Sequence, residues 1–280
     1  MSGQGITCAG TAVKIRSYMY GAVFGDIIGS WYEWHNRKSE DIELFPRGAR
    51  FTDDTVLTAA IAESILRMDD KSPAKCYASH IKMYYRRYPD AGFGNMFKEW
   101  ALSDTLKVQR SYGNGASMRV SAIAWAFEDE KELLHQVKES CYYTHNNREA
   151  IRCAQAVASA VFLARKGRSK EEIKARLEKE FKMDFVPLDL IRDSYRFDSR
   201  SDYSVPPAIE AFFESSDYES CIRKAVSIGG DSDTIAAIAG GIAEAYYGII
   251  PGEIRKKGRL LLDPGIKRVL DEFEERYCKN

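Results

Sequence analysis

Two segments of the sequence place paired carboxylates directly before an alanine-rich helical pattern. One is FTDDT at residues 51–55, and the other is GGDSDT at residues 229–234. Either segment alone is explained by helix capping, because a Thr or Asp side chain accepts free backbone N–H groups of the first turn. One carboxylate is enough for a cap, however, and each segment has two. Four carboxylates brought together would repel one another strongly unless cations lay between them.

The ligand chemistry of these two segments favours hard divalent cations. Their carboxylate and hydroxyl oxygens suit Mg²⁺, Mn²⁺ or Ca²⁺, whereas Cys and His are expected at zinc. The four histidines of the chain show no metal-binding spacing, and no His-Asp dyad supports a helical phosphohydrolase. If the two segments meet in the fold, the sequence predicts a divalent-metal site.

A third acidic segment is GDIIGSWYEW at residues 25–34. Asp26 and Glu33 are seven residues apart, so both lie on one face if the helix is continuous. Burying Glu33 among neighbouring tryptophans and a tyrosine is costly unless the carboxylate is paired or functional. A carboxylate at an exposed helix end is the alternative interpretation.

Two polar segments are candidates for ligand contacts. SYGNGASMR at residues 111–119 spaces glycines ahead of a helix that we expect to start near Ala116. Such loops expose backbone N–H groups to anions or diphosphates, although Asn-Gly also marks any tight turn. THNN at residues 144–147 contains His145, and a lone His at a helix junction is more often structural than catalytic.

The elements that must position these segments are helices. Apolar residues recur at helical spacing, for example over residues 56–65, 120–127 and 151–162, and no alternating strand pattern occurs. Helix starts are indicated at Ser72-Pro73, at Ser169 and at Pro206-Pro207. We therefore predict an all-α bundle that forms a single domain over residues 1–280.

One long loop is expected, from Arg192 to Ser204, where the sequence is polar. An interdomain linker there is disfavoured, because the flanking helical patterns share the same composition and compact folds rarely contain so long a bare connection.

Composition excludes several classes of protein. Forty-one basic and 41 acidic residues give a formal net charge of zero, which argues against a general nucleic-acid binder. Neutrality is an average, since the stretch between Lys224 and Arg255 contains four acids and no base. An acidic pocket there remains compatible with a neutral protein.

Targeting signals and cysteine usage favour a reduced, cytoplasmic protein. The longest apolar run, residues 235–250, is shorter than the ~20 residues that span a bilayer. Asp26 and several glycines interrupt the apolar stretch after Lys14 and Arg16, so no signal peptide is predicted. The six cysteines are scattered singly and form no disulfide framework or CxxC pair: Cys8, Cys76, Cys141, Cys153, Cys221 and Cys278.

With these motifs in this order, the chain resembles the ADP-ribosylglycohydrolase family, whose members cleave the glycosidic bond between ADP-ribose and an acceptor. The motifs that carry the resemblance are GDIIGSWYE, FTDDT, SYGNGASMR, THNN and GGDSDT, which extend from Gly25 to Thr234. The resemblance implies an all-helical domain with two Mg²⁺ ions in a cleft, Mn²⁺ being the alternative ion.

Matching the motifs residue by residue implies the roles of individual side chains. The metal ligands implied are Thr52, Asp53, Asp54, Asp231, Asp233 and Thr234. The substrate-binding residues implied are Ser111, Tyr112, Gly113, Asn114, Gly115, Met118 and His145. The adenine contacts depart from the pattern, because Arg110 stands where close relatives often have a small residue and Leu106 where an aromatic would help hold adenine.

The reaction implied is metal-dependent hydrolysis that releases ADP-ribose from a modified protein, nucleic acid or small molecule. Four aspartates and two divalent ions sum to zero charge, which leaves Glu33 to activate water or relay a proton while Asp233 shares the catalytic role. Glu33 also resembles the glutamate of relatives that act on O-linked ADP-ribose. The alternatives are a non-catalytic ADP-ribose or nucleotide-binding module and a metal-dependent phosphoesterase that splits the diphosphate.

Overall fold

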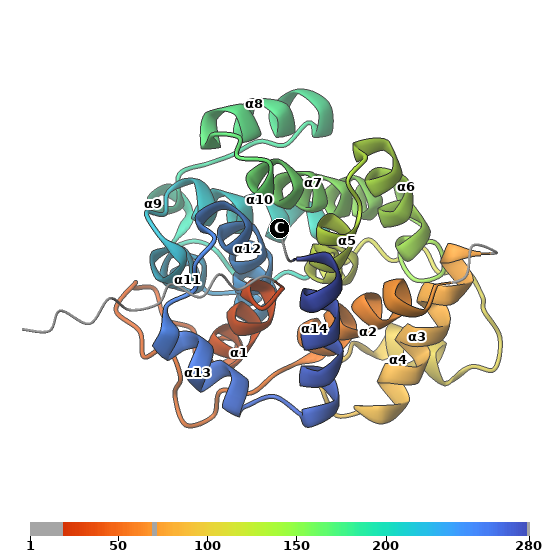
Figure 1. Ribbon diagram of the computed structural model, residues 1–280. Helices are drawn as coiled ribbons and strands as arrows, with labels where there is room; N and C mark the ends of the chain where they lie inside the picture. The colour runs from red at the N-terminus through yellow and green to blue at the C-terminus, as the bar shows by residue number, and fades with distance from the viewer. Residues whose placement is uncertain (1–18, 69–71, 279–280) are drawn as a thin grey trace, which may run out of the picture.

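The computed structural model describes residues 19–68 and 72–278, and within these ranges the chain is helical with connecting loops (Figure 1). These residues form no β-strand; two isolated bridges pair Arg110 with His145 and Gly113 with Arg200. The all-α prediction is confirmed. In chain order the helices are α1 (Gly21–Trp34), α2 (Asp53–Arg67), α3 (Pro73–Arg87), α4 (Asn95–Leu102), the 3₁₀-helix η1 (Asn114–Arg119), α5 (Ser121–Ala126), α6 (Glu130–Cys141), α7 (Arg148–Arg165), α8 (Lys170–Phe181), α9 (Leu188–Ile191), α10 (Ser201–Phe213), α11 (Tyr218–Ser227), α12 (Ser232–Tyr247), α13 (Gly252–Leu260) and α14 (Pro264–Tyr277).

Two findings bear on the targeting and redox predictions. Among the described helices, none combines the length and the apolar character needed to cross a membrane. Five cysteines lie in the described ranges, and none of the five forms a disulfide bond there. Cys8, Lys14 and Arg16 lie outside the described residues.

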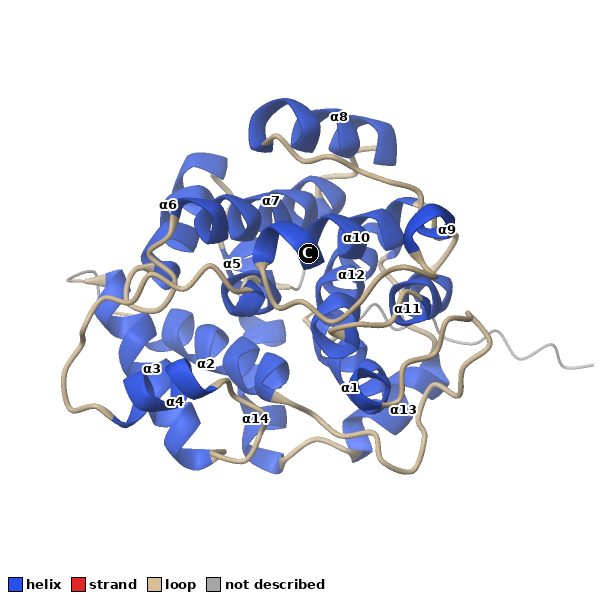
Figure 2. Ribbon diagram, turned by 180° about the vertical axis from the view of Figure 1, so that it is seen from behind, coloured by secondary structure: helices blue, strands red, loops and turns tan. Residues whose placement is uncertain are grey.

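Helices α1 and α12 pack against each other more extensively than any other pair of described helices. Glycine allows this approach, because a Cβ on Gly25 would lie 2.1 Å from the Ala236 carbonyl oxygen and one on Gly29 would lie 2.3 Å from that of Ser232. Helix α12 also packs on α7, α10 and α11, so most of its residues are buried. In both ribbon views this pair lies between α8 at one edge and α13 at the opposite edge (Figures 1 and 2).

Several helices begin where the sequence supplies a capping side chain. Thr52 caps α2, and Asn147 caps α7 by accepting from two backbone N–H groups. Ser169 and Glu172 form a capping box at α8, and Pro73 occupies the first turn of α3, as predicted. These local signals fix where these four helices start.

The predicted start of α10 at Pro206-Pro207 is wrong. The helix begins at Ser201 and contains both prolines, although a proline beyond the first turn removes a helical hydrogen bond. Contacts with the glycine motif, residues 111–119, hold this first turn of α10. The Ser201 N–H donates to the Tyr112 carbonyl oxygen at 3.0 Å, and the Ser201 hydroxyl donates to the Gly113 carbonyl oxygen at 2.6 Å. Tertiary contacts therefore override the local proline signal.

The loop predictions need two further corrections. The predicted loop from Arg192 to Ser204 ends at Arg200, because α10 begins earlier than expected, and a longer connection joins α1 to α2 over residues 35–52. The helix expected near Ala116 is η1 from Asn114 to Arg119, followed by α5 from Ser121.

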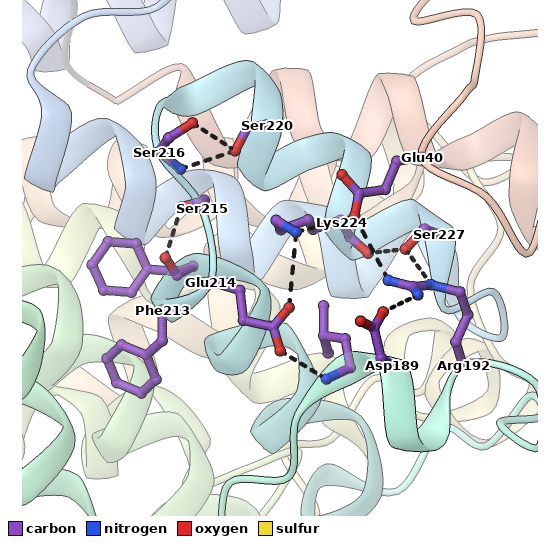
Figure 3. A network of polar contacts seen from close by, with 12 residues as sticks. Glu40, Asp189, Arg192, Phe213, Glu214, Ser215, Ser216, Ser220, Lys224 and Ser227 are labelled. Carbon is purple, nitrogen blue, oxygen red and sulfur yellow. Dashed lines mark hydrogen bonds and ion pairs between the residues drawn. The ribbon is translucent and has the colours of Figure 1, made fainter.

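A polar network links α11 to two connections, the one between α1 and α2 and the loop from Arg192 to Arg200 (Figure 3). Lys224 on α11 lies 3.0 Å from the Glu40 carboxylate, and Arg192 lies 3.7 Å from the same carboxylate. Nε of Arg192 also donates to the Ser227 hydroxyl at 3.1 Å. Glu40 belongs to the connection that follows α1. Arg192 begins the loop that pairs with residues 111–119, so the network holds both loops in place.

Candidate functional site

The acidic segments meet at one cavity of about 410 Å³. FTDDT opens α2, GGDSDT opens α12, and Glu33 lies in the last turn of α1. Glu33 lines this cavity together with all six residues predicted as metal ligands: Thr52, Asp53, Asp54, Asp231, Asp233 and Thr234. The condition on which the metal prediction depended, that the two segments meet, is fulfilled.

Asp233 is at the centre of the carboxylate cluster. Carboxylate oxygens of Asp26, Asp54 and Asp233 lie within 4.8 Å of one another, and so do those of Glu33, Asp231 and Asp233. Asp26 and Glu33 thus face the same cluster from α1, as their spacing predicts. Asp53 lines the same cavity, and the charges of Asp233 and Asp26 act on its carboxylate.

Asp26 anchors the FTDDT turn and is well supplied with donors. Its carboxylate accepts from the Thr52 N–H at 2.9 Å and from the Thr52 hydroxyl at 2.6 Å. It also accepts from the N–H and the hydroxyl of Thr55. Asp26 therefore caps α2 from the neighbouring helix and fixes the position of Asp53 and Asp54.

Asp54 and Asp231 lack the contacts that helix capping requires. One carboxylate oxygen of Asp54, Oδ1, is buried with no hydrogen-bond partner in the described structure, and Oδ2 has only hydroxyl contacts of 3.3 Å from Thr52 and Thr234. Asp231 occupies the N-cap position of α12 without capping it, and it accepts instead from the Asn114 side chain at 2.7 Å. Capping alone does not explain these two carboxylates.

Without cations, the cavity disfavours the charge of its own carboxylates. Burial, and then the charge of Asp233, raises the pKa values of Asp53, Asp54 and Asp231 well above the ordinary range. The same two causes raise the pKa of Glu33 to about 7. Bound cations would reverse both effects, since they supply the missing positive charge.

The donor set fits divalent metal ions. All of its members are oxygens, they come from two helix N-termini that face each other, and Asp54 contributes a buried oxygen that has no other partner. Hard cations such as Mg²⁺, Mn²⁺ and Ca²⁺ prefer such ligands.

The predicted glycine motif forms another wall of the same cavity. Its lining residues are Ser111, Gly113, Asn114, Gly115 and Met118, and His145 lies beside them. Tyr112 is not a lining residue and is 60% exposed. Two backbone donors of the loop are already used, since the Gly113 N–H donates to the Ser111 hydroxyl and the Asn114 N–H donates to the Ser199 carbonyl oxygen. These two N–H groups are therefore not free for a phosphate, contrary to the prediction for this loop.

Several wall residues were not predicted from the sequence. Arg50 is the one Lys or Arg among the described lining residues, and it precedes FTDDT by one residue. Phe197 and Ser199 come from the loop that pairs with the glycine motif, and residues 91–97 contribute from the loop before α4 and its first turn. The turn-forming composition at residues 89–95 was the available signal for that segment.

The chain is similar to known proteins over most of its length. The sequence model of the ADP-ribosylglycohydrolase family matches residues 8–279. The chain belongs to the ADP-ribosylglycohydrolase family. This membership identifies it as an ADP-ribosyl glycohydrolase.

The relatives of this ADP-ribosylglycohydrolase include proteins from animals and bacteria. ADP-ribosylhydrolase ARH3 of Mus musculus is 29% identical, with 84% of each chain covered, and that of Homo sapiens is 26% identical, with 84% of this chain and 86% of the relative covered. ADP-ribosylarginine hydrolase Tri1 of Pseudomonas putida is 26% identical, with 84% of this chain and 71% of the relative covered. A solved structure of an ADP-ribosylglycohydrolase-related protein complex shares the fold, with a TM-score of 0.64, 23% identity and coverage of 91% of this chain and 95% of that one.

Proposed function

We propose that the cavity binds two Mg²⁺ ions, with Mn²⁺ as a substitute, and that the protein hydrolyses the bond between ADP-ribose and an O-linked acceptor. The buried carboxylate cluster carries this proposal, because a cluster with an unpartnered Asp54 oxygen needs cations to be stable when ionised. Family membership supports the ADP-ribosyl substrate, and the cluster supports the metal.

The chain's own residues would hold the ions and orient the sugar. The ligands we propose are Thr52, Asp53, Asp54, Asp231, Asp233 and Thr234. When bound, the ions would supply a Lewis acid that fixes ribose hydroxyls and polarises water. Asp26 keeps the first acidic turn in register through its four hydrogen bonds.

Glu33 is the residue we propose for proton transfer. Its carboxylate lies at the cavity wall, near those of Asp231 and Asp233, and without cations its pKa is about 7. A carboxylate there can take a proton from water, and neighbouring carboxylates stabilise positive charge at the anomeric carbon. Asp233, as the shared member of both carboxylate groups, would hold this arrangement together.

Arg50 supports the choice of an O-linked acceptor. It lines the cavity, and its positive charge acts on the Glu33 carboxylate and lowers its pKa against burial. A positively charged guanidinium acceptor that left beside Glu33 would be repelled by Arg50, whereas a serine hydroxyl is neutral and an acetate would be attracted.

The test is ADP-ribose release from serine-linked and arginine-linked ADP-ribosyl peptides and from O-acetyl-ADP-ribose, each with Mg²⁺ or EDTA. We expect Mg²⁺-dependent release of intact ADP-ribose from the O-linked substrates. Binding without release would instead indicate a binding module, and AMP with ribose phosphate would indicate a phosphoesterase.

Glu33→Gln should keep ADP-ribose binding while slowing hydrolysis by roughly 10²-fold or more. Glu43→Gln is the matched control, because Glu43 is exposed and lies outside the cavity lining. A Glu33→Gln variant that only weakens binding would make Glu33 a substrate contact.

A further inference from the structure

His145, in the connection between α6 and α7, is held by a buried chain of polar contacts. Its Nδ1 lies 2.9 Å from the hydroxyl oxygen of Thr144, and that oxygen accepts a 2.8 Å hydrogen bond from Nη2 of Arg119. Arg119 is completely buried and also donates to the Ser140 carbonyl oxygen at 3.0 Å. Thr144 and His145 are buried too, so the Thr144 hydroxyl and Nδ1 of His145 need partners inside the protein.

The position of the imidazole hydrogen follows from the single hydrogen of the Thr144 hydroxyl. Burial lowers the pKa of Arg119 only to about 10, so its guanidinium stays charged and can only donate. If Nδ1 of His145 also donated, the Thr144 hydrogen would have no acceptor within the described part of the chain. If Nδ1 accepts, Arg119 donates to Thr144 and Thr144 donates to His145, and all three contacts are satisfied.

We propose that Arg119 and Thr144 are positioning residues that hold His145 as the neutral tautomer with its hydrogen on Nε2. This Nε2–H is then the donor offered to an oxygen of the ADP-ribosyl group. The ligand half of the inference rests on the proposed function, whereas the tautomer half stands without it.

The surroundings of His145 agree with a neutral ring. Burial, and then the positive charge of Arg119, lowers the pKa of His145 well below its ordinary value. A neutral ring with a fixed tautomer donates one hydrogen bond in one direction and does not exchange protons with the substrate at neutral pH.

The cavity side of the ring is open to a ligand. His145 lines the cavity, and a Cβ on Gly115 would lie 3.2 Å from Nε2, so the glycine leaves this nitrogen uncovered. Nε2 has no hydrogen-bond partner in residues 19–68 and 72–278. The N–H groups of Gly113 and Asn114 donate within the protein, so they are not available to a ligand. Nε2–H is therefore a hydrogen-bond donor on this wall that a ligand can use.

Two other histidines provide an internal contrast. Nδ1 of His35 lies 2.9 Å from the Trp31 carbonyl oxygen, and Nδ1 of His80 lies 3.0 Å from that of Cys76. A carbonyl can only accept, so both rings carry hydrogen on Nδ1. His145 should therefore differ from them in the same spectrum.

The experiment is long-range ¹H–¹⁵N correlation NMR of the histidine rings at neutral pH, with His145→Gln used only to assign the His145 signals. We expect a pyrrole-type Nε2 and a pyridine-type Nδ1 for His145, and the opposite pattern for His80. Thr144→Val should mix the tautomers of His145 and weaken ADP-ribose binding about tenfold or more, and Thr144→Ser should restore both.

The wild-type spectrum decides the tautomer by itself, even if the valine variant does not fold. Hydrogen on Nδ1, or on both nitrogens, would overturn the proposal, and so would a Thr144→Val protein with an unchanged spectrum and unchanged affinity. In the wild type, ADP-ribose should also shift the Nε2–H signal. Failure of ADP-ribose to bind while the tautomer is as predicted would refute the proposed function and the ligand assignment, and would leave the positioning role supported.

Discussion

The two ends of the α1–α12 pair both bury carboxylates but treat them differently. Near the start of α1, the carboxylate of Glu244 accepts from the backbone N–H groups of Tyr20 at 3.1 Å and Gly21 at 2.8 Å. Near the start of α12, the carboxylate of Asp233 lies within 4.8 Å of several others, and an oxygen of Asp54 has no partner. The same helix pair thus has one satisfied carboxylate at one end and an unsatisfied cluster at the other.

The difference teaches how to separate a structural carboxylate from a functional one. Glu244 replaces a missing N-cap of α1, so backbone donors match its oxygens one for one. In the cluster, carboxylate oxygens outnumber the hydrogen-bond donors that reach them, and bound cations would supply the missing partners while the carboxylates stay ionised.

The largest loss of activity is expected for Asp233→Asn, because the Asp233 carboxylate belongs to both groups of neighbouring carboxylates in the cluster. We expect ADP-ribose release to fall by roughly 10²- to 10³-fold while the circular dichroism spectrum stays that of the wild type. Asp231→Asn and Asp53→Asn should behave similarly. Wild-type turnover in these variants at saturating Mg²⁺ would refute the metal assignment.

Glu244, at the opposite end of the α1–α12 pair, should make the free energy of unfolding depend on pH by several kcal/mol. Burial raises its folded-state pKa from 4.5 to about 8 despite the N–H donors of Gly21 and Tyr20. Its contribution to stability is therefore complete below pH 4.5 and is lost as the pH rises to 8, at about 1.4 kcal/mol per pH unit.

Denaturant unfolding of wild type and Glu244→Gln between pH 5 and 8 measures this effect. The Gln amide cannot accept from both N–H groups, so the variant should be less stable at pH 5, and the gap should narrow as the pH rises. A gap that stays constant from pH 5 to 8 would show that Glu244 is already ionised in the folded protein.

A smaller effect distinguishes the acidic cluster from Glu244: the order of the unfolding temperatures of variant and wild type should reverse when Mg²⁺ is added. In EDTA, Asp53→Asn should unfold at a higher temperature than the wild type, because it removes a buried carboxylate whose pKa is raised by burial and by the charge of Asp233. In saturating Mg²⁺ the wild type should become the more stable protein, since ligand at 100 times its Kd contributes about 2.7 kcal/mol. Thermal unfolding measures both orders, and Glu244→Gln should show no such reversal.

The helical fold and the acidic centre were predictable because their signals are local. Periodic apolar residues, the capping box at Ser169 and the paired carboxylates of the two turns can all be read within a few residues. The order of the motifs then indicated that the turns meet, although only the fold brings residues 54 and 233 together.

What the sequence hid depends on contacts between distant segments. The first turn of α10 forms because Ser201 pairs with the glycine loop, against the proline signal. The same pairing uses the Asn114 N–H that had been expected to face a phosphate. Arg50 and Phe197 reach the cavity from loops whose paths no local pattern specifies.

The measurement that tests the central claim most directly is Mn²⁺ or Mg²⁺ binding by titration calorimetry to wild type, Asp233→Asn and Glu244→Gln. We predict binding to the wild type and to Glu244→Gln with similar affinity, and its loss in Asp233→Asn. Equal binding by Asp233→Asn and wild type, or no binding by a folded wild type, would contradict a metal centre at the start of α12.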